Sequence, residues 1–267
     1  MSYNKQEPIV LISGFKAGTW LMRKILLSIT SMNFYEPEII PGEKKYYNPK
    51  MLKFKENHFY SWHLVPTDEI VDKLNNHQAK TIFVVRNIYD LVISIYYHFY
   101  NDIDADIGRG NKKDTFLSQF SFEDGLSLII TGFEENGLRW NGIIEVIDHY
   151  NEIFKASLKL KDNIIINYDK LVSDKEKAVK EIINFLDVNI SKENLESIID
   201  KSSFNAMKKD AQLKGKGESH FRTGKVKSNR EQLSLVHKIQ LRQMIKITAP
   251  DIYENAKSIN FTDIVLD

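Results

Sequence analysis

Three short apolar runs, each followed by a helical pattern, constrain the fold of this chain most strongly. The runs are residues 8–12 (PIVLI), 81–85 (TIFVV) and 164–168 (IIINY). Continuous apolar runs of this length are typical of strands that are buried on both faces of a sheet. Apolar residues recur at helical spacing after each run, in residues 21–29, 89–100 and 178–186. This order predicts an α/β fold, with a central parallel sheet flanked by helices on both faces.

The C-terminal third reads as mostly helical. Asp174 is a candidate cap for the helix that contains residues 178–186, and Ser191 opens a second helix over 191–201. A third helix is expected over 231–247, with the apolar residues Leu233, Val236, Ile239 and Ile245. Because no linker rich in Pro, Gly or Ser interrupts the sequence, we expect one domain over residues 1–267.

Composition excludes several classes of function. The 37 Lys and Arg residues balance 36 Asp and Glu residues, so the net charge of +1 predicts neither nucleic-acid nor membrane-surface binding. The chain has no cysteine, which excludes disulfides, thiolate catalysis and Cys-ligated zinc. No signal-peptide pattern and no apolar run near the length of a membrane span is found, so we expect a cytoplasmic protein. The histidines lack a metal-binding spacing, and no metal is predicted.

The first apolar run leads into a turn that suits a phosphate. Gly14 and Gly18 allow a close backbone approach, Lys16 supplies a positive charge, and a helix follows Thr19. In an open parallel sheet, ligands bind beyond the carboxyl ends of the strands, where this turn would lie. An ordinary strand-to-helix turn with a surface lysine is the alternative. The turn is not a Walker A motif, because the lysine precedes the second glycine.

The second apolar run ends in a comparable position. Arg86 follows the strand, and Ser94 lies eight residues further on, two helical turns into the next helix. An arginine fork and a hydroxyl can then converge on one anion. The alternative is an ordinary ion pair between Arg86 and Asp90 or another acidic residue.

These two segments resemble a known family. The sequence FKAGTWLMRKIL, starting at Phe15, is similar to the 5′-phosphosulfate loop of sulfotransferases that use 3′-phosphoadenosine 5′-phosphosulfate (PAPS), although Phe15 replaces a common proline. The segment VVRNIYDLVISIYYHF resembles the family's 3′-phosphate segment. The resemblance implies a P-loop-like domain. It also implies that residues of both segments bind the cofactor, namely Lys16, Ala17, Gly18, Thr19, Trp20, Arg86 and Ser94.

Four further segments resemble the family in the same chain order. They are SWHLVP with His63, IINYDKL with Tyr168, SSFNAMKK with Ser203 and Phe204, and HFRTGKVKSNREQLS with Arg222, Thr223 and Gly224. In the last segment Thr223 replaces a lysine and Asn229 a tryptophan, so Lys225 or Lys227 is a candidate for the missing charge. The residues read alone allow other roles, as core aromatics or as a solvated basic loop.

The resemblance implies transfer of a sulfuryl group from PAPS to a hydroxyl or an amine of a small-molecule acceptor. His63 would be the base, Lys16 would stabilise the leaving group, and Ser94 would complete the catalytic set. The product would be 3′-phosphoadenosine 5′-phosphate (PAP). Two alternatives stay open: a catalytically silent PAP-binding module and a kinase-like nucleotide-binding protein.

The acceptor is not identified by these motifs. Candidate segments are residues 35–60, with Tyr46, Tyr47, Phe54 and Phe59, and residues 97–120, with Asp102, Asp104 and Asp106. The three aspartates would suit a cationic acceptor, whereas a solvated loop is the ordinary reading of such a charge run. Ser61 stands where many cytosolic members carry a lysine, which argues against transferring their acceptor specificity.

Overall fold

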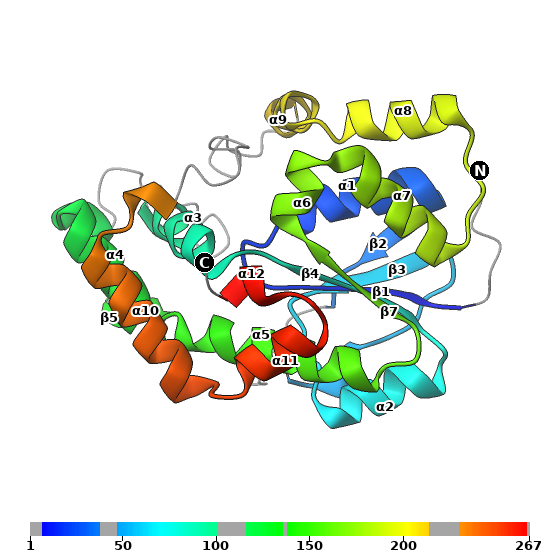
Figure 1. Ribbon diagram of the computed structural model, residues 1–267. Helices are drawn as coiled ribbons and strands as arrows, with labels where there is room; N and C mark the ends of the chain where they lie inside the picture. The colour runs from blue at the N-terminus through cyan, green and yellow to red at the C-terminus, as the bar shows by residue number, and fades with distance from the viewer. Residues whose placement is uncertain (1–6, 38–46, 101–115, 136–137, 214–229, 266–267) are drawn as a thin grey trace.

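The centre of the protein is a five-stranded parallel sheet (Figure 1). The computed structural model describes residues 7–37, 47–100, 116–135, 138–213 and 230–265. The strand order is β2-β3-β1-β4-β7, and the strands are β1 (Ile9–Ser13), β2 (Asn33–Tyr35), β3 (His58–Trp62), β4 (Lys80–Val85) and β7 (Asn163–Asn167). Leu11 pairs with Ser61 on one side and with Ile82 on the other, so β1 lies in the middle.

Helices cover both faces of this sheet, as the sequence predicts. On one face lie α1 (Thr19–Thr30), α6 (Tyr168–Ser173), α7 (Lys175–Leu186) and α8 (Lys192–Lys201). On the other lie α2 (Asp68–Asn76), α5 (Ile144–Lys159) and α11 (Ile252–Ser258). The side chains of β1 alternate between the two cores, because Ile9 and Leu11 pack with α1 while Val10 and Ile12 pack with the opposite layer.

The remaining elements extend the molecule beside the sheet. They are α3 (Ile88–Tyr100), α4 (Phe122–Thr131), the antiparallel pair β5 (Phe133–Glu135) and β6 (Leu138–Trp140), α9 (Phe204–Leu213), α10 (Leu235–Thr248) and α12 (Thr262–Val265). Short 3-10 helices span Pro49–Met51, Phe116–Gln119 and Arg230–Gln232. Across the described ranges, no helix is both long enough and apolar enough to span a bilayer.

The predicted helix caps are confirmed. The Asp174 side chain accepts a hydrogen bond from the Lys177 amide, and Ser191 accepts one from the Asn194 amide. Each cap satisfies an amide at the start of its helix that has no partner within the helix.

The structure differs from the predicted elements in three respects. Strands β2 and β3 were not predicted, and Tyr168 begins α6 rather than ending β7. The apolar pattern over residues 231–247 is also misleading, because Val236 is 62% exposed and Ile239 is 45% exposed on α10. Leu233, before that helix, and Ile245 are buried as expected.

Candidate functional site

The turn between β1 and α1 is built around two aromatic residues from distant parts of the chain. A Cβ atom on Gly14 would lie 2.3 Å from the ring of Tyr150, and one on Gly18 would lie 2.3 Å from the ring of Tyr168. Gly18 also has a φ of 102°, and Lys16 has a φ of 59°, which is uncommon for a residue with a side chain. The two glycines are therefore required by close packing, and the backbone of Lys16 is held in a conformation found more often at binding sites.

This turn presents the start of α1 without a side-chain cap. Gly18 is the N-cap residue, and the first helical bond runs from the Met22 amide to the Gly18 carbonyl. The helix dipole and the free amides of the first turn favour an anion at this end. The Ala17 amide donates to the Gly14 carbonyl at 3.1 Å and closes the turn.

Arg86 follows β4 directly and lies beside the same turn. Its backbone amide donates to the hydroxyl of buried Tyr150 at 2.9 Å, and its guanidinium lies 4.6 Å from the centre of the Tyr168 ring. Its Nη1 donates to the Lys16 carbonyl at 3.5 Å. Arg86 is only 8% exposed, and its Nε has no hydrogen-bond partner among the described residues. A buried cation in this state is suited to an anionic ligand.

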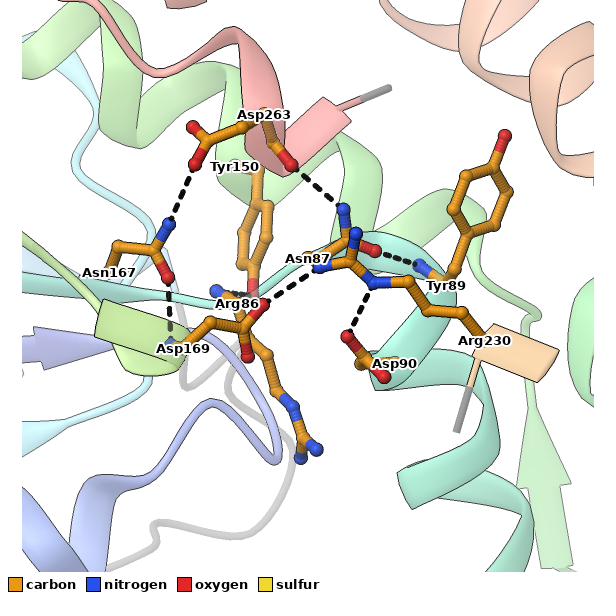
Figure 2. Close-up of polar contacts among 9 residues, drawn as sticks. All are labelled: Arg86, Asn87, Tyr89, Asp90, Tyr150, Asn167, Asp169, Arg230 and Asp263. Carbon is orange, nitrogen blue, oxygen red and sulfur yellow. Dashed lines mark hydrogen bonds and ion pairs between the residues drawn. The ribbon is translucent and has the colours of Figure 1, made fainter. Parts of the chain in front are cut away.

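The alternative ion pair between Arg86 and Asp90 does not form. Asp90 is bound instead by Arg230, whose Nε donates to the Asp90 carboxylate at 2.8 Å and whose Nη2 donates to Asp169 at 3.0 Å. Figure 2 shows the Arg86 side chain extending away from the ion pair of Arg230 and Asp90. Burial, followed by the charge of Asp90, raises the pKa of Asp169, whereas Arg86 and Arg230 oppose that shift.

Lys16 carries a second positive charge at the turn. Burial, and secondarily the charge of Arg86, lowers the pKa of Lys16 from 10.5 to about 8. In the part of the chain that the structure describes, Lys16 has no carboxylate partner. Lys16 and Arg86 raise each other's electrostatic energy, and among the described residues Asp169 acts on Arg86 only from beyond ion-pair distance. A bound anion would relieve the repulsion between the two cations.

His63 lies at the end of β3, next to the turn. Its Nδ1 is 2.7 Å from the Ser13 carbonyl oxygen, which can only accept a hydrogen bond. Nδ1 therefore carries the hydrogen, and Nε2 is the basic nitrogen of the neutral ring. Phe15 packs against the imidazole with its ring edge at a centroid distance of 6.0 Å. The Ser13 hydroxyl lies 2.7 Å from the Thr19 hydroxyl, so β1, β3 and α1 are joined at this point.

A second histidine lies behind this one. His149 is buried, its Nε2 lies 2.9 Å from the Leu64 carbonyl, and burial followed by the proximity of His63 lowers its pKa to about 4. His149 is therefore neutral near pH 7 and donates to Leu64, which is a structural role. His58 and His77 likewise bind backbone carbonyls, and His237 bonds with Ser127, Ser234 and Glu123.

The other predicted cofactor residues lie on separate elements. Ser94 is half-buried on α3, and Trp20 is 42% exposed on α1. Ser203 caps α9 by accepting from the Ala206 amide at 3.3 Å, and Phe204 is the first residue of that helix. An ion pair of 3.3 Å between Lys24 and Asp210 joins α9 to α1. Arg222, Thr223, Gly224, Lys225, Lys227 and Asn229 lie outside the described residues.

Some of the predicted acceptor residues can be placed. Phe59 is fully buried in the core against α1, so it is excluded as an acceptor contact. Tyr47 is 42% exposed and its hydroxyl donates to Asp148 at 3.4 Å. Tyr46, Asp102, Asp104 and Asp106 lie outside the described residues. Among the residues that are described, no group of three or more His, Asp or Glu side chains is arranged to hold a metal ion.

Sequence reasoning missed a buried arginine behind the turn. The Arg23 Nε donates to the Ser61 hydroxyl at 2.7 Å, and its Nη2 donates to the Ser61 carbonyl at 3.0 Å. Arg23 also pairs with Glu36 and lies 4.6 Å from the centre of the Phe34 ring. The positive charge beside Ser61 therefore comes from α1. The sequence signal for Arg23 was its spacing of four residues from Thr19, which places both residues on one face of the helix.

Comparison with known proteins gives a family match and several similar chains. A profile of the family described as "Sulfotransferase domain" matches residues 6–257. Mouse Sulfotransferase 6B1 is 25% identical over 215 residues, which is 78% of this chain and 64% of the mouse protein. The match thus spans slightly less than two thirds of that relative. Human Sulfotransferase 2B1 is 31% identical over 132 residues, or 49% of this chain and 31% of the human protein.

Solved structures share the fold. Mouse sulfotransferase SULT7A1 in complex with PAP has a TM-score of 0.65 at 17% identity, covering 96% of this chain and 89% of the mouse chain. Retinol dehydratase with androsterone and PAP has a TM-score of 0.62 at 16% identity, covering 94% of this chain and 80% of that one. At these identities the likeness establishes the α/β architecture.

Proposed function

The chain belongs to the sulfotransferase domain family, and from that premise we propose that it transfers the sulfuryl group of PAPS to a hydroxyl or an amine of a small-molecule acceptor. One observation carries the proposal. Lys16 and Arg86 lie together at the uncapped start of α1, and neither forms an ion pair with a carboxylate among the described residues. Such a site suits a ligand with more than one anionic group.

Different residues of the site would bind different parts of the cofactor. The amides at the start of α1 and Lys16 would hold the 5′ end, and Arg86 with Ser94 would hold the 3′-phosphate. Tyr168, which contacts Gly18 and lies under Arg86, would contact the nucleotide between these ends. Ser203, Phe204 and the segment with Arg222, Thr223 and Gly224 stay predictions from the family resemblance. PAP in the two solved neighbours supports the choice of nucleotide.

The chemistry requires a base and a cation on opposite sides of the transferred group. When bound, PAPS supplies the sulfuryl group and leaves as PAP. His63 would accept the acceptor proton at Nε2, because Nδ1 is engaged with Ser13. Lys16 would stabilise the negative charge that develops on the leaving phosphate.

A thermal-shift titration with PAP tests the proposal. A ligand at 100 times its dissociation constant stabilises a fold by about 2.7 kcal/mol, which predicts a rise in Tm of roughly 5–10 °C for this chain. ATP and adenosine 5′-phosphosulfate serve as controls. No shift with PAP, or a larger one with ATP, would contradict the proposal and favour a kinase-like protein. PAP binding without transfer to any member of a broad acceptor panel would favour the silent module.

Substitution of Arg86 should remove the preference for a 3′-phosphate. A charge-assisted hydrogen bond contributes about 1.5–3 kcal/mol, so Arg86→Ala is expected to weaken PAP binding roughly 10- to 100-fold. The affinity for AMP, which lacks the 3′-phosphate, should change much less. Calorimetry with both nucleotides measures the difference, and Arg139→Ala on the exposed β5-β6 pair is the matched control. Unchanged PAP affinity in Arg86→Ala would show that the 3′-phosphate assignment is wrong.

A further inference from the structure

Two buried asparagines lie near the carboxyl ends of the neighbouring strands β4 and β7. Asn87 lies two residues beyond the end of β4, and Asn167 is the last residue of β7, where it pairs in register with Val85. The side-chain oxygen of Asn87 accepts from the Tyr89 amide at 3.0 Å, and that of Asn167 accepts from the Asp169 amide at 2.8 Å. Each asparagine therefore fixes the start of the helix that follows its strand.

The other half of each side chain binds one residue near the C-terminus. The Asn87 amide nitrogen donates to the backbone carbonyl of Asp263 at 2.8 Å, and the Asn167 amide nitrogen donates to the Asp263 carboxylate at 3.3 Å. Figure 2 shows Asp263 between the two asparagines. The asparagines are 1% and 4% exposed, so both depend on Asp263 for a partner that water cannot readily replace.

Both asparagines are adjacent in sequence to residues of the candidate nucleotide site. Arg86 directly precedes Asn87, and Tyr168 directly follows Asn167. The Arg86 guanidinium lies over the Tyr168 ring, so the spacing of these two side chains depends on how β4 and β7 continue into their helices. Asp263 comes from a distant part of the chain. By contacting both asparagines it links the segment that follows β4 to the end of β7.

We propose that Asp263 is a positioning residue for the nucleotide site, acting through Asn167 on Tyr168 and through Asn87 on Arg86. This inference rests on the proposed function. Asp263 acts on its two partners with different atoms, its carboxylate and its backbone carbonyl. A side-chain substitution therefore removes the contact with Asn167 and preserves the contact with Asn87, so the Asn167 half can be tested on its own.

The experiment measures the affinities of PAP and AMP for Asp263→Ala, Asp263→Asn and the wild-type chain. Both nucleotides share the adenosine that Tyr168 would contact, so Asp263→Ala should weaken both by the same factor. The upper limit is about fivefold, which is reached when the whole energy of the lost hydrogen bond contributes to binding. The ratio of the two affinities should stay unchanged, since Asn87 keeps its partner. Asp263→Asn keeps an acceptor oxygen and should restore both affinities.

Thr262→Ala is the matched control, because Thr262 is exposed in the same short helix. A lower Tm with unchanged affinities in Asp263→Ala would mean that the contact is merely structural and would overturn the inference, as would failure of Asp263→Asn to rescue binding.

If Asp263→Ala does not fold, Asp263→Ser replaces it under the same criteria. If the wild-type chain itself does not bind PAP, the proposed function is wrong and the inference falls with it. Wild-type binding with no change in the variants overturns the inference alone.

Discussion

Replacing His63 by alanine is expected to lower turnover by about 10² to 10⁴, the usual contribution of a positioned general base. The neutral imidazole is already oriented, because Nδ1 donates to the Ser13 carbonyl at 2.7 Å and Phe15 packs against the ring. A base at Nε2 acts on the acceptor and makes no contact with the nucleotide in the proposed arrangement. The dissociation constant of PAP should therefore stay the same. Steady-state rates at saturating PAPS, combined with calorimetry, separate the two quantities.

The control for this variant is His77→Ala. His77 is exposed at the C-terminal end of α2, where its Nδ1 bonds to the Lys73 carbonyl. Its removal should leave turnover unchanged. Near-normal turnover in His63→Ala would exclude His63 as the base, and a large loss of PAP affinity would assign it a binding role instead.

Replacing Lys16 by methionine is expected to lower turnover by about 10² or more, because the developing charge on the leaving phosphate loses its nearest cation. Binding of PAP should weaken as well, since Lys16 faces the 5′ end in the proposed arrangement. Lys180→Met, at an exposed lysine of α7 that pairs with Glu176, is the matched control. Full turnover in Lys16→Met would remove this lysine from the mechanism.

The pH dependence of PAP binding gives an independent test of Lys16. Burial and Arg86 lower its pKa to about 8, below the ordinary value of 10.5, so the free protein loses this charge as the pH rises through about 8. PAP affinity should then be highest below pH 8 and should fall above it. Lys16→Arg keeps its charge in this range and should show no such decrease. A flat profile in the wild-type chain would mean that Lys16 does not contact the anion.

The sheet could be predicted where its strands are continuous apolar runs. β1 and β4 are buried along nearly their whole length, and β7 carries three consecutive isoleucines between two asparagines. β3 was not predicted, because the polar residue Ser61, although buried, interrupts the apolar run in its sequence HFYSW. Ser61 is tolerated there because Arg23 donates to it, a contact that depends on tertiary structure.

The candidate site was predictable where one segment carries several of its residues. The turn around Lys16 and the strand end at Arg86 were identified from short motifs. Tyr150 could not be found in this way, since it reaches Gly14 and Arg86 from α5 and has no motif around it. The same holds for Arg230 and Asp263, whose partners lie 61 to 176 residues away. The roles assigned to site residues, the single domain and the cytoplasmic location stay predictions.

Strand β1 is near the start of the chain but in the middle of the sheet. Its partners β3 and β4 begin only at His58 and Lys80, and the Gly14 amide donates to Val84 at 3.1 Å. Gly14 also packs against Tyr150, which comes later still. Pairings between such distant segments form slowly, because chain entropy is lost before the contacts are gained. On a ribosome, the turn between β1 and α1 is synthesised before Tyr150 and can take its final shape only after α5 has emerged, and until then β1 needs protection from aggregation.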